Sequence, residues 1–233
     1  MVRRDAGGLR APGGSPHARP RGSRDGLADR PRLLPAGASP LTDQTAPLAP
    51  SPDVAYIPSP TVERFILAAA APDPAMRMLI LMSSRGEGKT TGGIYACLAL
   101  AETIQRLGRG RLLPLRVAVI RDTWANLART TLVSFEQNKQ RGLPIELSDG
   151  GRQADILRLV HFDFFGLDRD DDADKLQGYE CGVLWLEEVA PAAGLASGVP
   201  STSLGLGATS VRQMGVPKRI LVTMNPPDED HWI

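Results

Sequence analysis

The feature that most constrains this chain is an apolar run at residues 78–82 that leads into a glycine-containing loop and then into a helix-forming segment. The run is short and follows two prolines, which favours a buried strand. Over residues 89–107, apolar side chains recur every three or four positions, as on one helix face, and Gly108 and Gly110 favour a helix end. A strand, a loop and a helix in this order form half of a βαβ unit.

The same alternation continues along the chain. Residues 117–120 and 156–165 predict two further strands, with one amphipathic helix between them that Thr123 can cap. Short apolar runs at 183–186 and 219–223 predict the last two strands. Five strands that alternate with helices indicate an α/β fold of three layers, with a mainly parallel central sheet flanked by helices.

Composition divides the chain near residue 60. Residues 1–60 hold 7 Gly and 11 Pro, against 17 and 9 in the remaining 173 residues, and eight Arg against five Asp. So few apolar side chains cannot offset the entropy of folding. We therefore expect residues 1–52 to form a disordered tail and residues 53–233 to form one domain. The tail arginines contact nucleic acid in one interpretation and only solvent in the other.

Composition also excludes several classes of protein. With 27 Lys and Arg against 26 Asp and Glu, overall charge indicates no partner. The longest strictly apolar run covers residues 65–71, far short of the roughly 20 residues that a membrane-spanning helix needs, so we expect no membrane partner. Cys97 and Cys181 lie far apart without metal-ligand spacing, which predicts reduced thiols and a cytoplasmic location.

A phosphate-binding loop is indicated after the first strand, where the chain reads Ser83-Ser84-Arg85-Gly86-Glu87-Gly88-Lys89-Thr90. This sequence resembles a Walker A loop, in which glycines let backbone N–H groups approach a triphosphate at a helix N-terminus. Lys89 would reach the β- and γ-phosphates, and the Thr90 hydroxyl would hold Mg²⁺. Ser83 stands where a glycine usually opens the motif. A glycine turn beside a chance Gly-Lys-Thr is the alternative.

A second motif is the apolar run at 183–186, which leads directly into Glu187 and Glu188. At the end of a strand beside the phosphate loop, Glu187 can hold a water of Mg²⁺, and Glu188 can polarise the attacking water. Asp is commoner than Glu at the first of these positions. Two solvated glutamates that open a turn are the alternative.

A third element is the strand at 219–223, which ends in polar residues before two prolines. In ATPases with an extra strand between the Walker A and Walker B strands, a polar residue at the tip of that strand senses the γ-phosphate. Thr223 and Asn225 are placed to do so, although an ordinary turn is the alternative. Gly92 and Gly93 fit a helix that lies close on a sheet, because in a surface helix each would cost about 1 kcal/mol relative to Ala.

Together these motifs resemble the ATPase domain of the large terminase subunit of tailed bacteriophages, over residues 56–232. The phosphate loop of that family also has an arginine before its first central glycine and often lacks the opening glycine. Residues 164–178 resemble the family's approach to its catalytic strand, which carries paired acids, usually Asp-Glu. Residues 223–227, with His231 and Trp232, resemble the motif that couples hydrolysis to DNA movement.

The resemblance implies a P-loop NTPase motor that hydrolyses Mg·ATP to move double-stranded DNA into a procapsid. It also implies a homo-oligomeric ring, contacts with the phage portal protein and the small terminase subunit, and action in the cytoplasm of a bacterial host, encoded by a phage or prophage. The catalytic residues would be Glu188, Lys89 and Arg85, and Mg²⁺ would lie at Thr90 and Glu187. ATP would be bound by Ser84, Arg85, Gly86, Glu87, Gly88, Lys89, Thr90, Thr91, Tyr56 and Asn225.

Several residues have two interpretations each. Tyr56 lies where such ATPases place an adenine-contacting segment, but a tyrosine that packs on the core is equally compatible. Arg121 matches a recurrent arginine of the family, and a surface salt bridge explains it equally well. Arg212 is a candidate arginine finger for a neighbouring subunit, with a DNA phosphate or solvent as its other partners. The aspartates at 168–174 are expected to be solvated linker charges.

A complete large terminase continues into a nuclease domain, whereas this sequence ends at Ile233. We therefore expect either a fragment or a separately encoded nuclease. Two other functions stay open. One is a helicase-like P-loop ATPase that acts on nucleic acid without packaging. The other is a truncated module that binds nucleotide without turnover, which Ser83 and Glu187 would explain as departures from the usual motifs.

Overall fold

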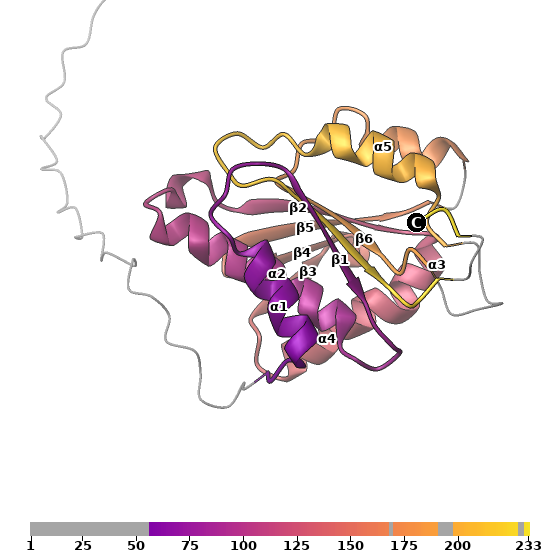
Figure 1. Ribbon diagram of the computed structural model, residues 1–233, viewed down its shortest axis with the longest axis horizontal. Coiled ribbons are helices and arrows are strands. Elements are labelled where there is room, and N and C mark those ends of the chain that lie inside the picture. Colours follow the sequence, from indigo (N-terminus) through magenta and orange to yellow (C-terminus); the bar gives the residue numbers. More distant parts are fainter. Residues whose placement is uncertain (1–55, 168–169, 191–197, 228–230) are drawn as a thin grey trace, which may run out of the picture. The chain divides into compact units, whose positions relative to one another are not determined.

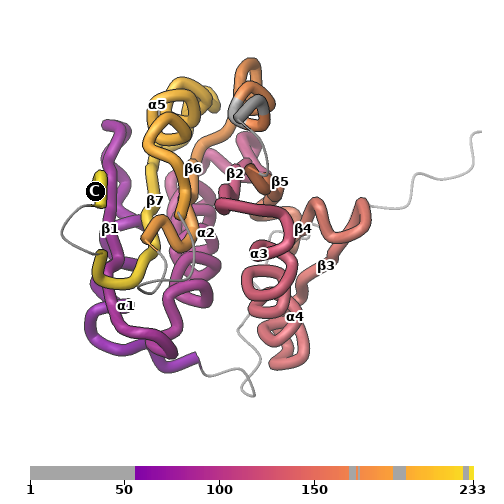
Figure 2. Tube along the Cα trace, turned by 90° about the vertical axis from the view of Figure 1, so that its right-hand side faces the viewer, coloured from indigo at the N-terminus to yellow at the C-terminus, as the bar shows by residue number. Residues whose placement is uncertain are grey.

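The computed structural model describes residues 56–167, 170–190, 198–227 and 231–233, and the expected tail at residues 1–52 lies outside them. Its centre is a seven-stranded sheet in the order β1-β7-β6-β2-β5-β4-β3, which Figure 2 shows from left to right. The first five strands of that order run parallel, and β4 and β3 are antiparallel to their neighbours. The strands are β1 (Arg77–Met82), β2 (Leu115–Arg121), β3 (Ile145–Ser148), β4 (Gln153–Ile156), β5 (Val160–Gly166), β6 (Val183–Glu187) and β7 (Arg219–Met224).

Helices cover both faces of the sheet, with α1, α2 and α4 on one side and α5 on the other (Figure 1). Side chains of β2 alternate between two cores, because Val117 and Val119 pack on the α2 side while Ala118 and Ile120 pack on the α5 side. The predicted three-layer α/β fold is therefore confirmed. The helices are α1 (Pro60–Ala69), α2 (Lys89–Arg106), α3 (Trp124–Asn126), α4 (Leu132–Gln140) and α5 (Ser201–Ser210), with a π-helix η2 (Leu127–Thr131) and 3₁₀ turns η1 (Gly110–Leu112), η3 (Asp149–Gly151) and η4 (Asp170–Leu176).

The long helix that the sequence predicts is α2, which begins at Lys89 and ends just before Gly108. Neither α2 nor any other helix of the described residues is long and apolar enough to cross a membrane. The two adjacent glycines of α2 allow close packing on both sides, as predicted. A Cβ atom at Gly92 would lie 2.6 Å from a methyl group of Val62 in α1, and one at Gly93 would lie 2.2 Å from the ring of Trp185 in β6. Any larger residue at position 93 would therefore push α2 away from the sheet.

The region predicted as one strand at 156–165 is a hairpin of β4 and β5. Leu157 and Arg158 form its turn with positive φ angles of 53° and 55°. Neither β3 nor β4 was predicted, because side chains on one face of these strands are polar, such as Glu146 and Gln153, and they dilute the apolar signal.

The prediction of a buried first strand is wrong. β1 is an edge strand, and only Leu81 is fully buried in it. Met78, Ile80 and Met82 are 49%, 47% and 49% exposed. These three side chains alternate along the strand, on a face that none of the described residues covers fully.

Other local predictions are changed in detail. Thr123 caps a helix as predicted, accepting a hydrogen bond from the Asn126 amide at 3.1 Å, but the helix is interrupted by η2 before it continues as α4. The Gly/Ser-rich stretch after residue 200 forms α5, which was not predicted, and neither was α1, capped by Ser59. Asp172 is buried and paired with Lys175, so the aspartate-rich loop is not wholly solvated.

Candidate active site

Four parallel strands deliver polar residues to the same edge of the sheet. The phosphate loop follows β1, Asn225 follows β7, Glu187 and Glu188 lie at the end of β6, and Arg121 ends β2. Parallel strands place their carboxyl ends together, so these residues converge although they are far apart in sequence. β7 pairs with both β1 and β6, which is the position expected for the extra strand of such ATPases.

The phosphate loop can accept an anion. Gly86 and Gly88 have φ angles of 82° and 75°, a conformation that favours glycine. Gly88 is the N-cap residue of α2 and provides no side-chain cap, so within the described part of the chain no capping side chain accepts from the first N–H groups of this 18-residue helix. The buried Ser83 hydroxyl also has no hydrogen-bond partner among the described residues. A phosphate group would satisfy such donors.

Lys89 is buried beneath this loop. Its Nζ donates to the carbonyl oxygens of Ser83 and Ser84 at 2.9 and 2.7 Å, and to Oδ1 of Asn225 at 3.1 Å. Burial lowers the pKa of Lys89, whereas the carboxylates of Glu188 and Glu187 oppose this shift. The Asn225 contact joins the tip of β7 to the phosphate loop.

The two predicted Mg²⁺ ligands are in direct contact. Thr90 Oγ1 donates to Glu187 Oε1 at 2.7 Å, across 97 positions of sequence. Glu187 is 1% exposed, and this burial raises the pKa of its carboxyl. The charge of Arg121 and the hydrogen bond from the Thr90 hydroxyl both oppose this rise in pKa. Hydroxyl and carboxylate oxygens are ligands that Mg²⁺ prefers, and Mg²⁺ commonly completes its shell with water and substrate phosphates. The residues present therefore fit a Mg²⁺ ion that is bound together with a nucleotide.

Glu188 has a strained backbone, with a φ angle of 51°. Non-glycine residues rarely adopt this conformation, and they persist in it where the surrounding structure holds them. The Glu188 side chain is 27% exposed, and its Oε2 accepts a hydrogen bond from Arg121 Nη2 at 2.6 Å. The chain thus has a carboxylate at a position whose backbone conformation a glycine would adopt at lower energy.

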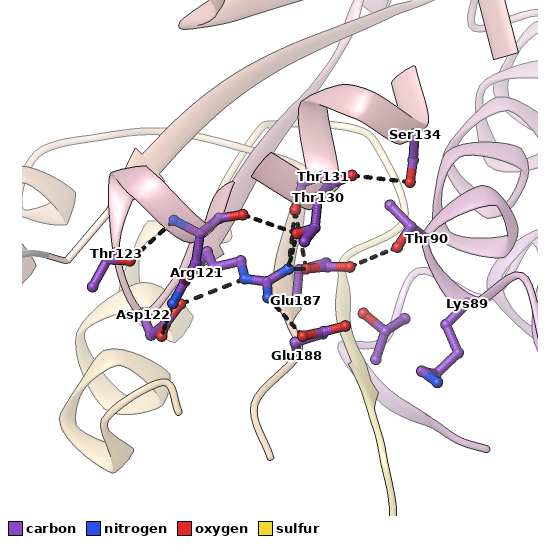
Figure 3. A network of polar contacts seen from close by, with 12 residues as sticks. Lys89, Thr90, Arg121, Asp122, Thr123, Thr130, Thr131, Ser134, Glu187 and Glu188 are labelled. Carbon is purple, nitrogen blue, oxygen red and sulfur yellow. Dashed lines mark hydrogen bonds and ion pairs between the residues drawn. The ribbon is translucent and has the colours of Figure 1, made fainter. Parts of the chain in front are cut away.

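Arg121 forms the centre of this polar network (Figure 3). It is 5% exposed, so its interpretation as a surface salt bridge is wrong. Its Nη1 contacts Glu187 Oε2 at 2.5 Å and donates to Thr130 Oγ1 at 2.6 Å, while Nη2 contacts Glu188. Thr131 also donates to Glu187, at 3.0 Å. The guanidinium lies between the two acids and ties them to η2.

The other predicted nucleotide-binding residues surround the loop. Tyr56 stacks on Tyr95 of α2, with ring centroids 4.6 Å apart, and a Cβ atom at Gly88 would lie 3.3 Å from its hydroxyl. Ser84, Glu87 and Arg85 are exposed on the loop, and within the described residues Arg85 forms no hydrogen bond or ion pair. The Thr91 hydroxyl accepts a hydrogen bond from Asn138 of α4, so its side chain is used in helix packing.

Thr223 and Arg212 are two further candidates. Thr223 is fully buried and accepts a hydrogen bond from Trp185 Nε1 at 2.9 Å, so its hydroxyl is not free to sense a phosphate. Arg212 is exposed beside Cys181, at the amino end of β6, and so lies at the sheet edge opposite the phosphate loop. Trp232 of the predicted coupling motif donates to the Val199 carbonyl at 3.0 Å.

No protein-family model matches the chain, and no curated protein matches it. Among solved structures, the large terminase from a thermophilic bacteriophage is similar at a TM-score of 0.49 and 13% identity, over 76% of this chain and 41% of the other. The same protein in complex with ATP-γ-S gives 0.45 and 14%, over 72% and 38%, and in complex with ADP 0.43 and 13%, over the same shares. The chain thus spans about two fifths of the length of these structures. Such low identities and TM-scores leave function to be argued from the chain's own residues.

The sequence did not reveal the partners of Arg121. Thr130 and Thr131 lie in the π-helix, and no local pattern distinguishes them from helix surface residues. The one signal was the position of Arg121 at the end of a predicted strand. Helix segments of the π type often occur at functional sites, but they are recognised only in a structure.

Proposed function

We propose that this chain is the ATPase motor domain of a phage DNA-packaging terminase large subunit. In this function it binds Mg·ATP at the phosphate loop and hydrolyses it, and the energy moves double-stranded DNA into a procapsid. The observation that carries the proposal is the 2.7 Å hydrogen bond between Thr90 and Glu187, which brings the phosphate loop and the acidic strand into one site.

Binding is assigned to the loop and the start of α2. Uncapped N–H groups and the Lys89 ammonium would face the β- and γ-phosphates, and Tyr56 lies beside the loop where a base could be held. Mg²⁺ would be held by Thr90 and Glu187, and it would neutralise charge on the phosphates during transfer.

Hydrolysis is assigned to Glu188. Its carboxylate would accept a proton from the attacking water, whose oxygen forms a bond to the γ-phosphorus as the bond to the ADP oxygen breaks. Asn225, bonded to Lys89, would report the state of the γ-phosphate to the chain beyond β7. A ring of copies belongs to the proposal, because a single domain has nothing to push against. The portal protein and the small terminase subunit belong to it as partners that the resemblance implies.

Turnover measurements test the proposal most directly. ATP hydrolysis by the natural chain should be stimulated by duplex DNA and reduced at least about a hundredfold in Lys89→Ala and in Glu188→Gln. Glu188→Gln should still bind ATP, whereas Lys89→Ala should bind it poorly. Lys139→Ala and Glu180→Gln change exposed residues of the same types and should behave as the natural chain.

The outcomes separate the alternatives. Stimulation by single strands rather than duplex DNA would indicate a helicase-like ATPase. ATP binding without turnover in every condition would indicate the truncated nucleotide-binding module. Equal turnover in the natural chain, Lys89→Ala and Glu188→Gln would overturn the site assignment itself.

A further inference from the structure

Arg121 forms ion pairs with both of the acids to which the proposed function gives a role. One Nη atom lies 2.5 Å from Glu187 Oε2, and the other lies 2.6 Å from Glu188 Oε2. The Arg121 side chain is 6% exposed, and its Nε lies 3.4 Å from Asp122 Oδ1. A planar guanidinium can hold two carboxylates at once in this way, and it stays charged at every accessible pH.

These contacts limit what the two acids can bind. Oε2 of Glu188 is held by Arg121, so this oxygen is less available to a water or a cation. Oε2 of Glu187 is likewise held by Arg121, and its Oε1 accepts the hydrogen bond of the Thr90 hydroxyl. In the arrangement of Figure 3, the guanidinium of Arg121 thus stands beside both acids, where an external cation would be bound.

Arg121 is also anchored to the interrupted helix, through the same nitrogen that contacts Glu187. Its Nη1 donates to Thr130 Oγ1, which in turn donates to the Asn126 carbonyl at 2.9 Å. Thr131 donates to the same Glu187 oxygen that Arg121 contacts. The π-helix η2 thus places two successive hydroxyl groups against this ion-pair network. If Arg121 left these contacts, residues 123–140 would lose hydrogen bonds that hold them to the sheet.

We infer that Arg121 is a positioning residue that holds Glu187 and Glu188 in the nucleotide-free protein and competes with a divalent cation for them. The inference rests on the proposed function, since it concerns the same two acids. A fixed positive charge beside oxygen ligands opposes the entry of Mg²⁺ by Coulomb repulsion and by occupying those oxygens. Removing the guanidinium should therefore tighten cation-dependent nucleotide binding rather than weaken it.

The test compares ATPγS affinity in excess Mg²⁺ with its affinity in EDTA, measured by calorimetry on the full 233-residue chain. The ratio of the two affinities reports the contribution of the cation without any turnover. In Arg121→Gln this ratio should rise at least about tenfold over that of the natural chain, because one unit charge and the ion pairs with both Glu187 and Glu188 are removed. An unchanged or smaller ratio would overturn the inference.

Arg116→Gln is the matched control. Arg116 lies on the same strand and faces a carboxylate, Asp163, at 3.9 Å, but it is at the amino end of β2 and its side chain is 44% exposed. Its substitution should leave the affinity ratio within about twofold of the natural value. An equal rise in Arg116→Gln and Arg121→Gln would mean that overall charge, and not the hold on the two acids, sets the ratio.

Two measurements cover an Arg121→Gln variant that does not fold. Arg121→Lys keeps the charge but has one ammonium group for two carboxylates, so its ratio should lie between those of the natural chain and the Gln variant. In the natural chain, amide hydrogen exchange of residues 123–140 should be faster with Mg·ATPγS than with ATPγS in EDTA, because Thr130 loses its partner. Equal exchange in both conditions would contradict a released Arg121.

The failure of the inference is distinguishable from that of the proposed function. A natural chain that does not bind ATPγS at all, with or without Mg²⁺, would overturn the nucleotide site and the inference together. The other outcome is that the natural chain binds ATPγS through Lys89 and that all three arginine variants have the same ratio of affinities in Mg²⁺ and EDTA as the natural chain. That outcome would overturn the role of Arg121 alone.

Discussion

Two buried arginines lie at opposite ends of the parallel strands, and they are held in different ways. Arg219 begins β7 and is 0% exposed, and it donates only to backbone carbonyl groups, those of Ala69, Ala71, Asp73, Ala75 and Lys218. Arg121 ends β2, and its main partners are the two carboxylates of the candidate site. The carbonyl groups are fixed parts of the backbone, whereas the two carboxylates are the ones to which the proposed function gives a role. The charge of Arg219 thus serves to fix the fold, whereas we infer that a divalent cation competes with Arg121 for its two carboxylates.

The largest effect is expected for Arg219→Met. The substitution leaves the buried Ala69 carbonyl and the partly buried Ala71 and Asp73 carbonyls without this donor, and each such group costs roughly 1 to 3 kcal/mol, so we expect a loss of about 4 kcal/mol in the free energy of unfolding. Urea denaturation measures this loss. Arg64→Met, which removes an exposed arginine of α1, should change stability by less than about 0.5 kcal/mol.

ATPγS affinity of the Arg219→Met protein, measured under conditions where it is folded, should equal that of the natural chain. A changed affinity would show that the amino end of the sheet is coupled to the site, and the contrast between the two arginines would not hold.

A smaller loss is expected for Arg121→Gln. Breaking a buried ion pair by removing one partner costs about 3 kcal/mol or more, because a carboxylate is left buried without its counter-charge. The cost should fall in the triple variant Arg121→Gln with Glu187→Gln and Glu188→Gln, since no buried charge is then unpaired. Denaturation of the three proteins measures the recovery. The partners of Arg219 are backbone groups, so no substitution can restore its stability in the same way.

The backbone at Glu188 gives a third, smaller test. A left-handed conformation costs a non-glycine residue about 1 to 2 kcal/mol, so Glu188→Gly should be more stable than Glu188→Ala by about that amount. Both variants lose the contact with Arg121, and their comparison therefore isolates the backbone from the ion pair. Equal stability of the two proteins would mean that the position is not strained.

The smallest effect concerns thiol labelling at about pH 8, just below the ordinary pKa of a free thiol. Burial raises the pKa of Cys181 to about 12 and also raises the pKa of Cys97, so both thiols stay protonated and should react slowly in the folded protein. Cys181 precedes Gly182, whose carbonyl accepts a hydrogen bond from the Arg219 amide, so this thiol lies at the end of the strands that the Arg219 side chain holds. Arg219→Met keeps the amide but removes that side chain, and it should therefore speed the labelling of Cys181 more than Arg121→Gln does, with the labelled position identified by mass spectrometry. The reverse order would contradict a structural role confined to the amino end.

The positions of the loop and the acids in the fold were predictable because each motif directly follows an apolar run. Lys89, Glu188 and Asn225 could be assigned to one edge of the sheet from the rule that parallel strands end together. Arg121 could not be assigned a partner in the same way, because its contacts with Glu187 and Glu188 span 66 and 67 positions and depend on the order of the strands.

Local propensity also failed where the sheet decided the outcome. Met78, Ile80 and Met82 form an apolar run, but their exposure is set by the place of β1 at the edge. Thr223 was assigned to the phosphate from its place near a strand end, but its hydroxyl accepts a hydrogen bond from the indole of Trp185. Neither the edge position of β1 nor this hydrogen bond can be recognised from the sequence.

Trp185 links all three motif-bearing elements at one point. Its ring fills the space left by Gly93 in α2, its backbone belongs to β6, and its indole N–H is bonded to Thr223 in β7. These contacts oppose a sliding movement of α2 along the sheet. Under the proposed function, a force that arises at the phosphates would therefore move α2 and the sheet together, as one rigid unit. The flexibility of such a motor would lie where this domain connects to other parts.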